Sequence, residues 1–395
     1  MMAAHSSYDV VIIGGAMIGS AVAWWLARDP GFHGRILVIE RDPSFAEAST
    51  SHTNSCIRMQ FGTEVNVAIS RFGLAFIRSF RDHAGADAPE ISLDDFGYLY
   101  LADDRASADR LCAAQALQAR MGAGTRLLSP AQLRTAFPFM RWDDVLLGSH
   151  DPGEEGCFDG GTMFSEFRRR ARRMGVEEIR AEATGLRRTG DRITHVELSD
   201  GNAIACGHVV NAAGPRAAKV AAMARIAIPV EPRKRYTFTF EAEDRLPRKL
   251  PLTVDPCGIH FRSDGTLYMA GCPPQADDAC DPRDFEMDHS IWEDRVWPAL
   301  AARVPAFERI RLRNAWAGHY AYNTLDQNAL LGVHPDVSNL LFANGFSGHG
   351  LQQAPAVGRG IAEHIIHGGW RSLDLSPLSV ARLVEGRALT EAAVI

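Results

Sequence analysis

The sequence lacks the cysteine spacing of a disulfide scaffold or a zinc site. Its seven cysteines are odd in number and scattered along the chain, and no CxxC occurs. Secreted disulfide frameworks carry an even number of cysteines, and zinc sites carry closely spaced pairs such as CxxC. We therefore expect reduced thiols, a cytoplasmic location and no metal site.

Net positive charge and a hydrolase motif are also missing. The 42 Lys and Arg residues are outnumbered by 48 Asp and Glu residues, so the formal net charge is −6. A mildly acidic chain gives no reason to expect nucleic acid or an anionic membrane surface as a partner. The basic run FRRRARRMG at 167–175 is expected to form the solvated face of a helix. Without a GxSxG elbow, Ser/His/Asp hydrolysis has no support.

One long uncharged run is present, and three interpretations compete for it. Eighteen uncharged residues separate Asp9 from Arg28. The preceding MMAAHSSYD has no Lys or Arg, unlike a secretory signal, although the run is just long enough for a membrane helix. Its character changes along its length, because YDVVII is typical of a strand, GGAMIG of a turn and SAVAWWLARD of a helix. This order predicts a dinucleotide-binding unit and no transmembrane segment.

The glycines of the turn have separate predicted roles. Gly14 permits the tight turn after the strand, and Gly19 permits close packing of the helix on the strand. Between them the backbone approaches a pyrophosphate at the helix N-terminus. Ala16 stands where the fingerprint has its second glycine, with Gly15 just before it. One methyl group predicts a slightly displaced or water-bridged pyrophosphate rather than a lost site.

The next predicted strand ends in an acidic residue. GRILVIERD places Glu40 21 residues after Gly19, where a carboxylate accepts the ribose hydroxyls of an adenosine and disfavours a 2′-phosphate. NADP is therefore not expected, and a ligand-free βαβ unit is the alternative. This unit does not separate FAD from NAD. A flavin enzyme that also binds NAD(P)H usually carries a second GxGxxG after a strand, and none follows here.

Three later segments extend the pattern. RDPSFAEASTSHTNSCIRMQFG, from residue 41, is rich in Ser, Thr and Asn, which bind phosphate and ring edges or simply make turns. HVVNAAGPRA, at 208–217, is an apolar strand ending in a small-residue turn. NLLFANGFSGHGLQQAPAVGRGIAEHIIHGG, from residue 339, again runs from a strand through a glycine turn into a helix, with Pro355 expected in its first turn.

Together these segments resemble the D-amino-acid-oxidase-like (DAO) family of FAD-dependent oxidoreductases, particularly its sarcosine and glycine oxidase branch. The resemblance covers nearly the whole chain in the family's order, and GFSGHG with APAVG is its most specific part. KRYTF and AWAGHYAYNTLDQNALLG are similar to a subgroup that includes mitochondrial FAD-dependent oxidoreductase-domain proteins linked to assembly of respiratory complex I.

The resemblance implies an α/β plus α+β fold, in which a Rossmann-like FAD-binding domain is intertwined with an antiparallel-sheet substrate domain. The FAD-binding domain would comprise residues 1–62, 150–223 and 332–369, and the substrate domain residues 63–149 and 224–331. Residues 370–395 would form a C-terminal tail. FGYLYLA, RYTFTFEA and GIHFRSDGTLYMAG are the expected strands of the second domain, because β-branched and aromatic residues dominate them.

The cofactor implied is FAD, bound noncovalently. His52 lies where related dehydrogenases place a flavin-linked histidine, so a covalent bond there is the alternative. His319 lies near the flavin-linking cysteine of sarcosine oxidase, and no cysteine occurs there. The helix start in GFSGHGLQQ would stabilise negative charge on reduced flavin. The candidate cofactor-binding residues are Gly14, Gly15, Ala16, Met17, Ile18, Gly19, Glu40, Arg41, Ser49, Thr50, His52, Thr53, Asn54, Ser55, Ala183, Ala212, Ala213, Gly214, Gly318, Gly345, Phe346, Ser347, Gly348, His349, Gly350, Leu351 and Gln352.

The implied reaction oxidises the C–N bond of an amino acid or secondary amine by hydride transfer to flavin N5, with O₂ or another electron acceptor reoxidising the flavin. Arg58 matches the family's carboxylate-binding arginine, with a structural arginine as the alternative. Gln352 replaces a lysine of sarcosine oxidase, so a second cationic anchor is missing. Four further residues would line the cavity or fill the core: His260, Tyr320, Tyr322 and His349. A flavin-bearing assembly or interaction factor is the second functional class.

Overall fold

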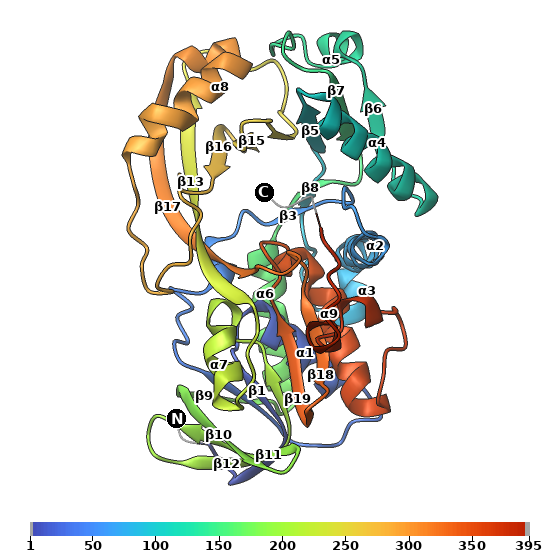
Figure 1. Ribbon diagram of the computed structural model, residues 1–395, viewed down its shortest axis with the longest axis vertical. Coiled ribbons are helices and arrows are strands. Elements are labelled where there is room, and N and C mark those ends of the chain that lie inside the picture. Colours follow the sequence, from blue (N-terminus) through green and yellow to red (C-terminus); the bar gives the residue numbers. More distant parts are fainter. Residues whose placement is uncertain (1–2, 392–395) are drawn as a thin grey trace.

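The computed structural model describes residues 3–391 and shows an elongated molecule built on two eight-stranded sheets, one in each half (Figure 1). A three-stranded sheet of β3 (Cys56–Ile57), β8 (Gly156–Phe158) and β4 (Leu93–Asp94) lies between the halves. The α-helices are α1 (Met17–Arg28), α2 (Glu64–Arg78), α3 (Phe80–Ala84), α4 (Arg105–Arg120), α5 (Pro130–Ala136), α6 (Gly160–Arg173), α7 (Ala217–Met223), α8 (Trp297–Arg303), α9 (Gly350–His367) and α10 (Ala381–Val384).

The first large sheet is mainly parallel. The parallel strands are β1 (Ser7–Ile13), β2 (Ile36–Glu40), β9 (Glu177–Arg180), β12 (Ala203–Asn211) and β19 (Val337–Asn344). Antiparallel strands extend it: β10 (Ala183–Thr189), β11 (Arg192–Leu198) and β18 (Leu330–His334). Three segments distant in sequence therefore meet in one Rossmann-like sheet.

Strand β1 is buried on both faces, which explains its continuous apolar sequence. Val10 and Ile12 pack into a core shared with α1, α6 and α9, whereas Val11 and Ile13 pack into a second core shared with α7. The eighteen-residue uncharged run is thus divided between β1 and α1. Within residues 3–391, no helix is both long and apolar enough to cross a membrane.

The turn between β1 and α1 confirms the predicted conformational roles of two glycines. Gly14 has φ +101°, a left-handed conformation that favours glycine. A Cβ atom on Gly19 would lie 1.9 Å from the Gly14 carbonyl oxygen. Any side chain at position 19 would therefore separate the helix from the strand and open the turn.

The second large sheet is antiparallel at every junction except β14–β5, and it confirms the three strand segments predicted for it. Its core is largely aromatic and includes Phe238, Phe240, Phe261 and Trp292. The strands, in order, are β17 (Ile310–Asn323), β13 (Val230–Ala242), β16 (Leu267–Cys272), β15 (His260–Asp264), β14 (Leu252–Val254), β5 (Tyr98–Ala102), β7 (Leu147–Asp151) and β6 (Arg126–Leu128). The paired strands β13 and β17 reach down toward the first sheet (Figure 1). The residue boundaries proposed for the two domains remain a prediction.

Two local predictions are wrong. Helix α9 begins at Gly350, so Pro355 lies in its second turn rather than its first, and proline has no N–H to donate to the Leu351 carbonyl. The basic run is not a fully solvated face, because Arg170 shares the buried side of α6 with Phe167 and Ala171. Arg170 is charge-compensated by Asp87 at 2.8 Å and Glu166 at 2.9 Å.

The chain after α9 folds back onto the body through a buried ion pair. Arg382 donates to both carboxylate oxygens of Asp326, at 2.8 and 3.0 Å, and to the Asn328 carbonyl at 3.1 Å. The Asp326 carboxylate also accepts the backbone N–H of Leu389 at 2.9 Å. The segment predicted as a tail is therefore anchored to the loop between β17 and β18.

We predict that Arg382→Ala lowers the free energy of unfolding by about 3–5 kcal/mol, because it leaves the Asp326 carboxylate buried without its cation. The side chains of this pair are 1% and 0% exposed. Urea unfolding of the variant measures the effect. In the control, Arg387→Ala removes the partner of Glu385 from a pair exposed to 64% and 46%, where a change of about 0.5 kcal/mol or less is expected. Equal losses in the two variants would contradict the assignment.

Candidate functional site

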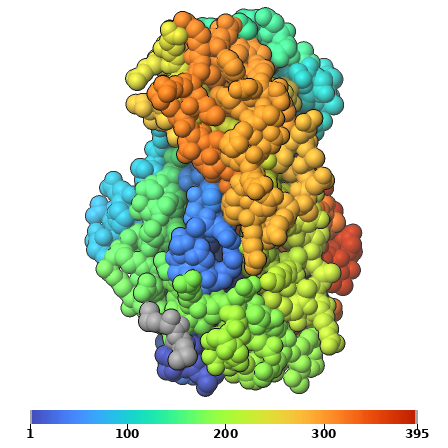
Figure 2. Space-filling model, turned by 90° about the vertical axis from the view of Figure 1, so that its left-hand side faces the viewer, coloured from blue at the N-terminus to red at the C-terminus, as the bar shows by residue number. Residues whose placement is uncertain are grey.

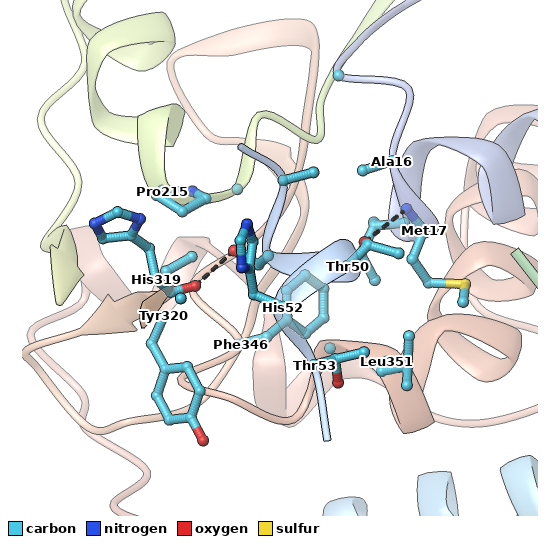
Figure 3. Close-up of a pocket in the computed structure, with 18 of the residues that line it drawn as sticks. Ala16, Met17, Thr50, His52, Thr53, Pro215, His319, Tyr320, Phe346 and Leu351 are labelled. Carbon is cyan, nitrogen blue, oxygen red and sulfur yellow. Dashed lines mark hydrogen bonds between the residues drawn. The ribbon is translucent and has the colours of Figure 1, made fainter. Parts of the chain in front are cut away.

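A long cleft lies between the two sheets and collects most of the predicted site residues. Its walls come from the β1–α1 turn, the end of β2, residues 45–58, the turn after β12, β13, β17 and residues 346–352. Figure 2 shows the surface hollowed where the blue segment around residue 50 meets the yellow-orange segment around residue 280. Figure 3 shows side chains from these separate segments facing one space.

Glu40 occupies the end of β2 beside the β1–α1 turn. Its Oε2 accepts the N–H of Gly15 at 2.8 Å, and its Oε1 accepts the N–H of Asp42 at 2.8 Å. These bonds fix the carboxylate against the turn. Because a carboxylate has about four acceptor positions, both oxygens can still accept the hydroxyls of a ribose.

Two helix N-termini point into the same cleft. Helix α1 begins after Ala16 and α9 begins after His349, and in the described chain neither position supplies a side-chain cap. Neither first turn contains an acidic residue. The Met17 N–H donates to Thr50 Oγ1 at 3.2 Å (Figure 3). The positive ends of two helices suit an anion at each position, which fits the pyrophosphate of FAD at α1 and negative charge on a reduced ring at α9.

The polar segment after β2 packs against β17. Ser49 lies in the single-turn helix η1 (Ser49–His52), and its Oγ donates to the His319 carbonyl at 2.6 Å. His52 Nε2 lies 2.7 Å from the Ala46 carbonyl oxygen, so this nitrogen carries the hydrogen. A Cβ on Gly318 would lie 2.7 Å from that of His52. Glycine at 318 thus allows β17 to approach the segment closely.

Arg58 is buried in the inner wall of the cleft and is held on several sides. It is 4% exposed, and its guanidinium lies 4.6 Å from the ring centre of Phe61, 5.9 Å from that of Tyr98 and 5.7 Å from that of Tyr100. Aromatic faces attract a guanidinium, so the rings fix its orientation. Arg58 is therefore a pre-positioned cation in the cleft.

The start of α9 contributes to this arrangement. Arg58 Nη2 lies 2.7 Å from His349 Nε2, and because a guanidinium only donates, Nε2 accepts and His349 is neutral. Gln352 Oε1 accepts the backbone N–H of Arg58 at 2.9 Å, while its Nε2 donates to Ser70 Oγ at 3.1 Å. Both ends of the Gln352 amide thus bond to protein atoms, and this side chain positions Arg58.

The opposite wall carries a neutral histidine among arginines. Burial, aided by nearby Arg262, Arg235 and Arg58, lowers the pKa of His260 to about 3. Its Nδ1 is buried and has no hydrogen-bond partner in residues 3–391. The Tyr320 ring lies 4.7 Å from the Arg235 guanidinium. Burial also raises the pKa of Tyr320, so its hydroxyl stays protonated.

The structure brings together most of the residues predicted from the sequence. Arg58, His260, Tyr320, His349 and Gln352 line the cleft, as do Ala183, Ala212, Ala213 and Gly214. In the described part of the chain, five predicted residues lie outside the lining: Gly15, Gly19, Gly345, Ser347 and Tyr322.

Each of these five has a structural explanation. Gly15 and Gly19 allow close packing at the first turn. Gly345 (φ +70°) and Ser347 (φ +49°) shape the turn before α9. The prediction that Tyr322 lines the cavity is wrong. Tyr322 lies two residues beyond Tyr320 on β17 and outside the cleft lining, and its ring centre lies 4.3 Å from the Arg233 guanidinium.

Sequence reasoning missed Arg235, Tyr98 and Cys56, which also line the cleft. Arg235 is held by Asp277 at 2.7 and 3.1 Å. The available signals were weak: an arginine inside an apolar strand, and the alternation of Tyr98 with Tyr100. Neither pattern predicts which distant segment of the chain these side chains will face.

Glu155 lies beneath the segment that carries Arg58. It is fully buried, and it accepts the N–H groups of Met59 and Gln60 at 2.5 and 3.0 Å and Gln60 Nε2 at 2.7 Å. Burial and the nearby Asp151 carboxylate raise the pKa of Glu155 to about 8, although its hydrogen bonds from Gln60 and Met59 lower it. The folded protein therefore retains a proton here that the unfolded chain releases near pH 4.5.

We predict that the stability contribution of Glu155 is fully present below about pH 4.5 and is lost as the pH rises to about 8. Each unit of pKa difference is about 1.4 kcal/mol, so the loss reaches a few kcal/mol. Glu155→Gln should flatten this slope in urea unfolding measured from pH 5 to 8.5. Glu154→Gln, at the partly exposed neighbour, is the control. Parallel pH profiles for the wild type and Glu155→Gln would contradict the prediction.

Comparison with known proteins places the chain in a family. Residues 9–364 match the family model described as FAD dependent oxidoreductase (DAO). The chain is 37% identical to FAD-dependent oxidoreductase domain-containing protein 1 of Xenopus laevis, over 98% of this chain and 85% of that protein. It is 26% identical to mitochondrial sarcosine dehydrogenase of Homo sapiens, over 92% of this chain and 40% of that protein.

Solved structures agree with this placement. The crystal structure of L-proline dehydrogenase from P. horikoshii superposes with a TM-score of 0.85 at 25% identity, covering 97% of this chain and all of that one. Glycine oxidase from Geobacillus kaustophilus shares the fold, with a TM-score of 0.78 at 19% identity over 96% and 99% of the two chains. The chain with its helix-flanked cleft therefore belongs to the DAO family of FAD-dependent oxidoreductases.

Proposed function

We propose that this FAD-dependent oxidoreductase oxidises the C–N bond of an amino acid, with N-substituted amino acids as the preferred class. The observation that carries the proposal is Arg58, a buried and oriented guanidinium in the cleft wall beside the start of α9. A guanidinium in a desolvated site suits a carboxylate, because it can donate two parallel hydrogen bonds.

Bound FAD supplies the two-electron acceptor for the C–H bond next to nitrogen. In this proposal Arg58 holds the substrate carboxylate, and the N-terminus of α9 stabilises negative charge that develops beside it. His260 lines the same cleft and is neutral, so it adds no positive charge beside the substrate amine. Burial together with Arg262, Arg235 and Arg58 lowers the pKa of His260, and the same surroundings would lower the pKa of an amine bound there. The neutral amine, which is the reactive form, is thereby favoured without a separate base.

The relatives support the substrate class. Sarcosine dehydrogenase and L-proline dehydrogenase are named for amino acids whose nitrogen carries a second carbon substituent. In this chain the lysine position of sarcosine oxidase is Gln352, whose amide bonds to Arg58 and Ser70. The carboxylate would therefore rest on Arg58 without a second cation at position 352, and sarcosine itself is not the expected substrate.

A flavin-bearing assembly or interaction factor is the second candidate function. It is favoured by the same Gln352 observation, and by the pairing of Arg235, another cation of the cleft lining, with Asp277. The relatives at 37% identity carry a name that states no substrate. Reduction of bound flavin by an amino acid separates the two functions, because an assembly factor with little turnover would leave the flavin oxidised.

We predict that the FAD is bound noncovalently. The candidate attachment residue His52 uses Nε2 as a donor to Ala46, and position 318–319 has no cysteine. Precipitation of the purified protein with acid should release the yellow colour into the supernatant. A yellow pellet would contradict the prediction, and His52→Ala would then test whether that histidine is the attachment point.

We predict that Arg58→Ala lowers kcat/KM. The loss of transition-state stabilisation should be about 2–5 kcal/mol, as when one member of a buried charge pair is removed. Arg58→Lys keeps the charge but loses the planar fork, so KM should rise while FAD remains bound. Initial rates with a carboxylate substrate and the visible spectrum of each variant measure both effects. Arg71→Ala, at an exposed arginine outside the cleft lining, is the control. Loss of flavin from both Arg58 variants would assign Arg58 a structural role, and unchanged kinetics would contradict carboxylate binding by Arg58.

A further inference from the structure

Two cysteines lie directly opposite each other in the small central sheet. Cys56 of β3 pairs with Cys157 of β8 in antiparallel register. The Phe158 N–H donates to the Ser55 carbonyl at 2.8 Å, so the adjacent Cys56–Cys157 pair is the one without backbone hydrogen bonds. In such pairs the Cα atoms are about 4.5 Å apart and the side chains are closest. Disulfides span Cα separations of about 4.4–6.8 Å, so a pair of this kind is compatible with a disulfide.

The two thiols converge on one carbonyl. Cys56 Sγ lies 3.2 Å and Cys157 Sγ 3.5 Å from the Asn54 carbonyl oxygen. The same oxygen accepts from Arg262 Nη2 at 3.3 Å, and Arg262 is 4% exposed. A cation is therefore buried beside both sulfur atoms. Neither cysteine is fully buried, and Cys56 lines the cleft.

This environment makes the two sulfurs unequal. The hydrogen bond from Cys157 and the charge of Arg262 lower the pKa of Cys56 to about 6, although burial raises it. The hydrogen bond to Cys56, together with burial, raises the pKa of Cys157. The thiolate is the reactive form of cysteine, so the two residues differ in role: Cys56 supplies the nucleophile, and Cys157 remains a thiol beside it.

We propose that Cys56 and Cys157 form a redox-active pair that hydrogen peroxide oxidises reversibly to a disulfide at the wall of the cleft. The Cys56 thiolate attacks one peroxide oxygen, the O–O bond breaks, and hydroxide leaves, giving a sulfenic acid at Cys56. The Cys157 sulfur then attacks the Cys56 sulfur, and the sulfenic oxygen leaves as water with the Cys157 proton. Two electrons pass from the thiols to one peroxide, and a dithiol reductant restores both thiols.

Oxidation of Cys56 and Cys157 would change hydrogen bonds in the wall of the cleft. In the disulfide neither sulfur can donate to the Asn54 carbonyl, which then retains Arg262 as its donor. Asn54 and Ser55 line the cleft. Oxidation therefore changes the hydrogen bonding of the segment that carries the predicted flavin contacts. If O₂ reoxidises the flavin, the peroxide arises in the cleft that Cys56 lines. The pair itself requires only peroxide, so this inference stands or fails independently of the amine substrate.

The test treats the purified full-length holoprotein with hydrogen peroxide, blocks remaining thiols with N-ethylmaleimide and digests with trypsin. Peptides 42–58 and 142–168 each contain one cysteine, Cys56 and Cys157 respectively. The expected product is these two peptides joined, lighter by two hydrogens than their sum and separated again by dithiothreitol. Two of the seven thiols should be lost. The linked pair should form equally in Cys112→Ser and Cys257→Ser, which remove exposed cysteines.

A second variant tests the order of the steps. In Cys157→Ser the sulfenic acid has no partner, so dimedone should label Cys56; in Cys56→Ser, Cys157 should remain unlabelled at the same peroxide concentration. Dimedone labelling of Cys157 in place of Cys56 would overturn the assigned roles. Oxidation of Cys112 or Cys257 in wild-type protein, with no linked 42–58 and 142–168 peptides, would overturn the proposal itself.

Discussion

The contact between Arg58 and the start of α9 is the interaction on which the cleft depends. It joins chain segments 291 residues apart through Nη2 of Arg58 and Nε2 of His349, and the Gln352 amide closes the same contact through the Arg58 backbone. A buried guanidinium must keep its partners, because a charge left alone away from water is costly. The segment that carries Arg58, the N-terminus of α9 and strand β5 of the antiparallel sheet thereby meet around one buried cation in the cleft wall.

Local sequence patterns predicted the fold well where the residues of one segment determine its structure. The β1–α1 turn, Glu40 at the end of β2 and the apolar strands are local patterns, and the structure has them as expected. Patterns failed where a distant partner decides the outcome. Arg170 is buried because α6 packs with its i, i+3, i+4 face inward and Asp87 compensates the charge. Pro355 lies deeper in α9 because Gly350 already belongs to the helix.

The candidate site was predictable to a similar extent. Glycine turns and the resemblance indicated both helix N-termini and Arg58, which the structure places in one cleft. Arg235 and Tyr98 reach that cleft through sheet pairing far along the chain, which no local pattern encodes. Tyr322 lies on the same face of β17 as Tyr320 because side chains alternate along a strand, yet it packs on Arg233 outside the cleft lining. Burial and the three arginines Arg58, Arg235 and Arg262 keep His260 neutral, and these arginines come from three separate segments of the chain.

Anaerobic reduction of the bound flavin tests the central claim most directly. The protein would be mixed, in the absence of oxygen, with matched pairs of compounds. Each pair is an amino acid and the amine that lacks its carboxylate, such as L-proline and pyrrolidine. The series covers amino acids with a free amino group and N-alkyl amino acids. We predict that at least one amino acid bleaches the visible flavin absorbance and that its decarboxylated partner does so far more slowly. Equal bleaching by the two members of a pair would contradict carboxylate recognition by Arg58. As a control, light with a chemical electron donor should reduce the bound flavin. If that control works and no member of the series reduces the flavin, the result would contradict the amino-acid oxidoreductase account.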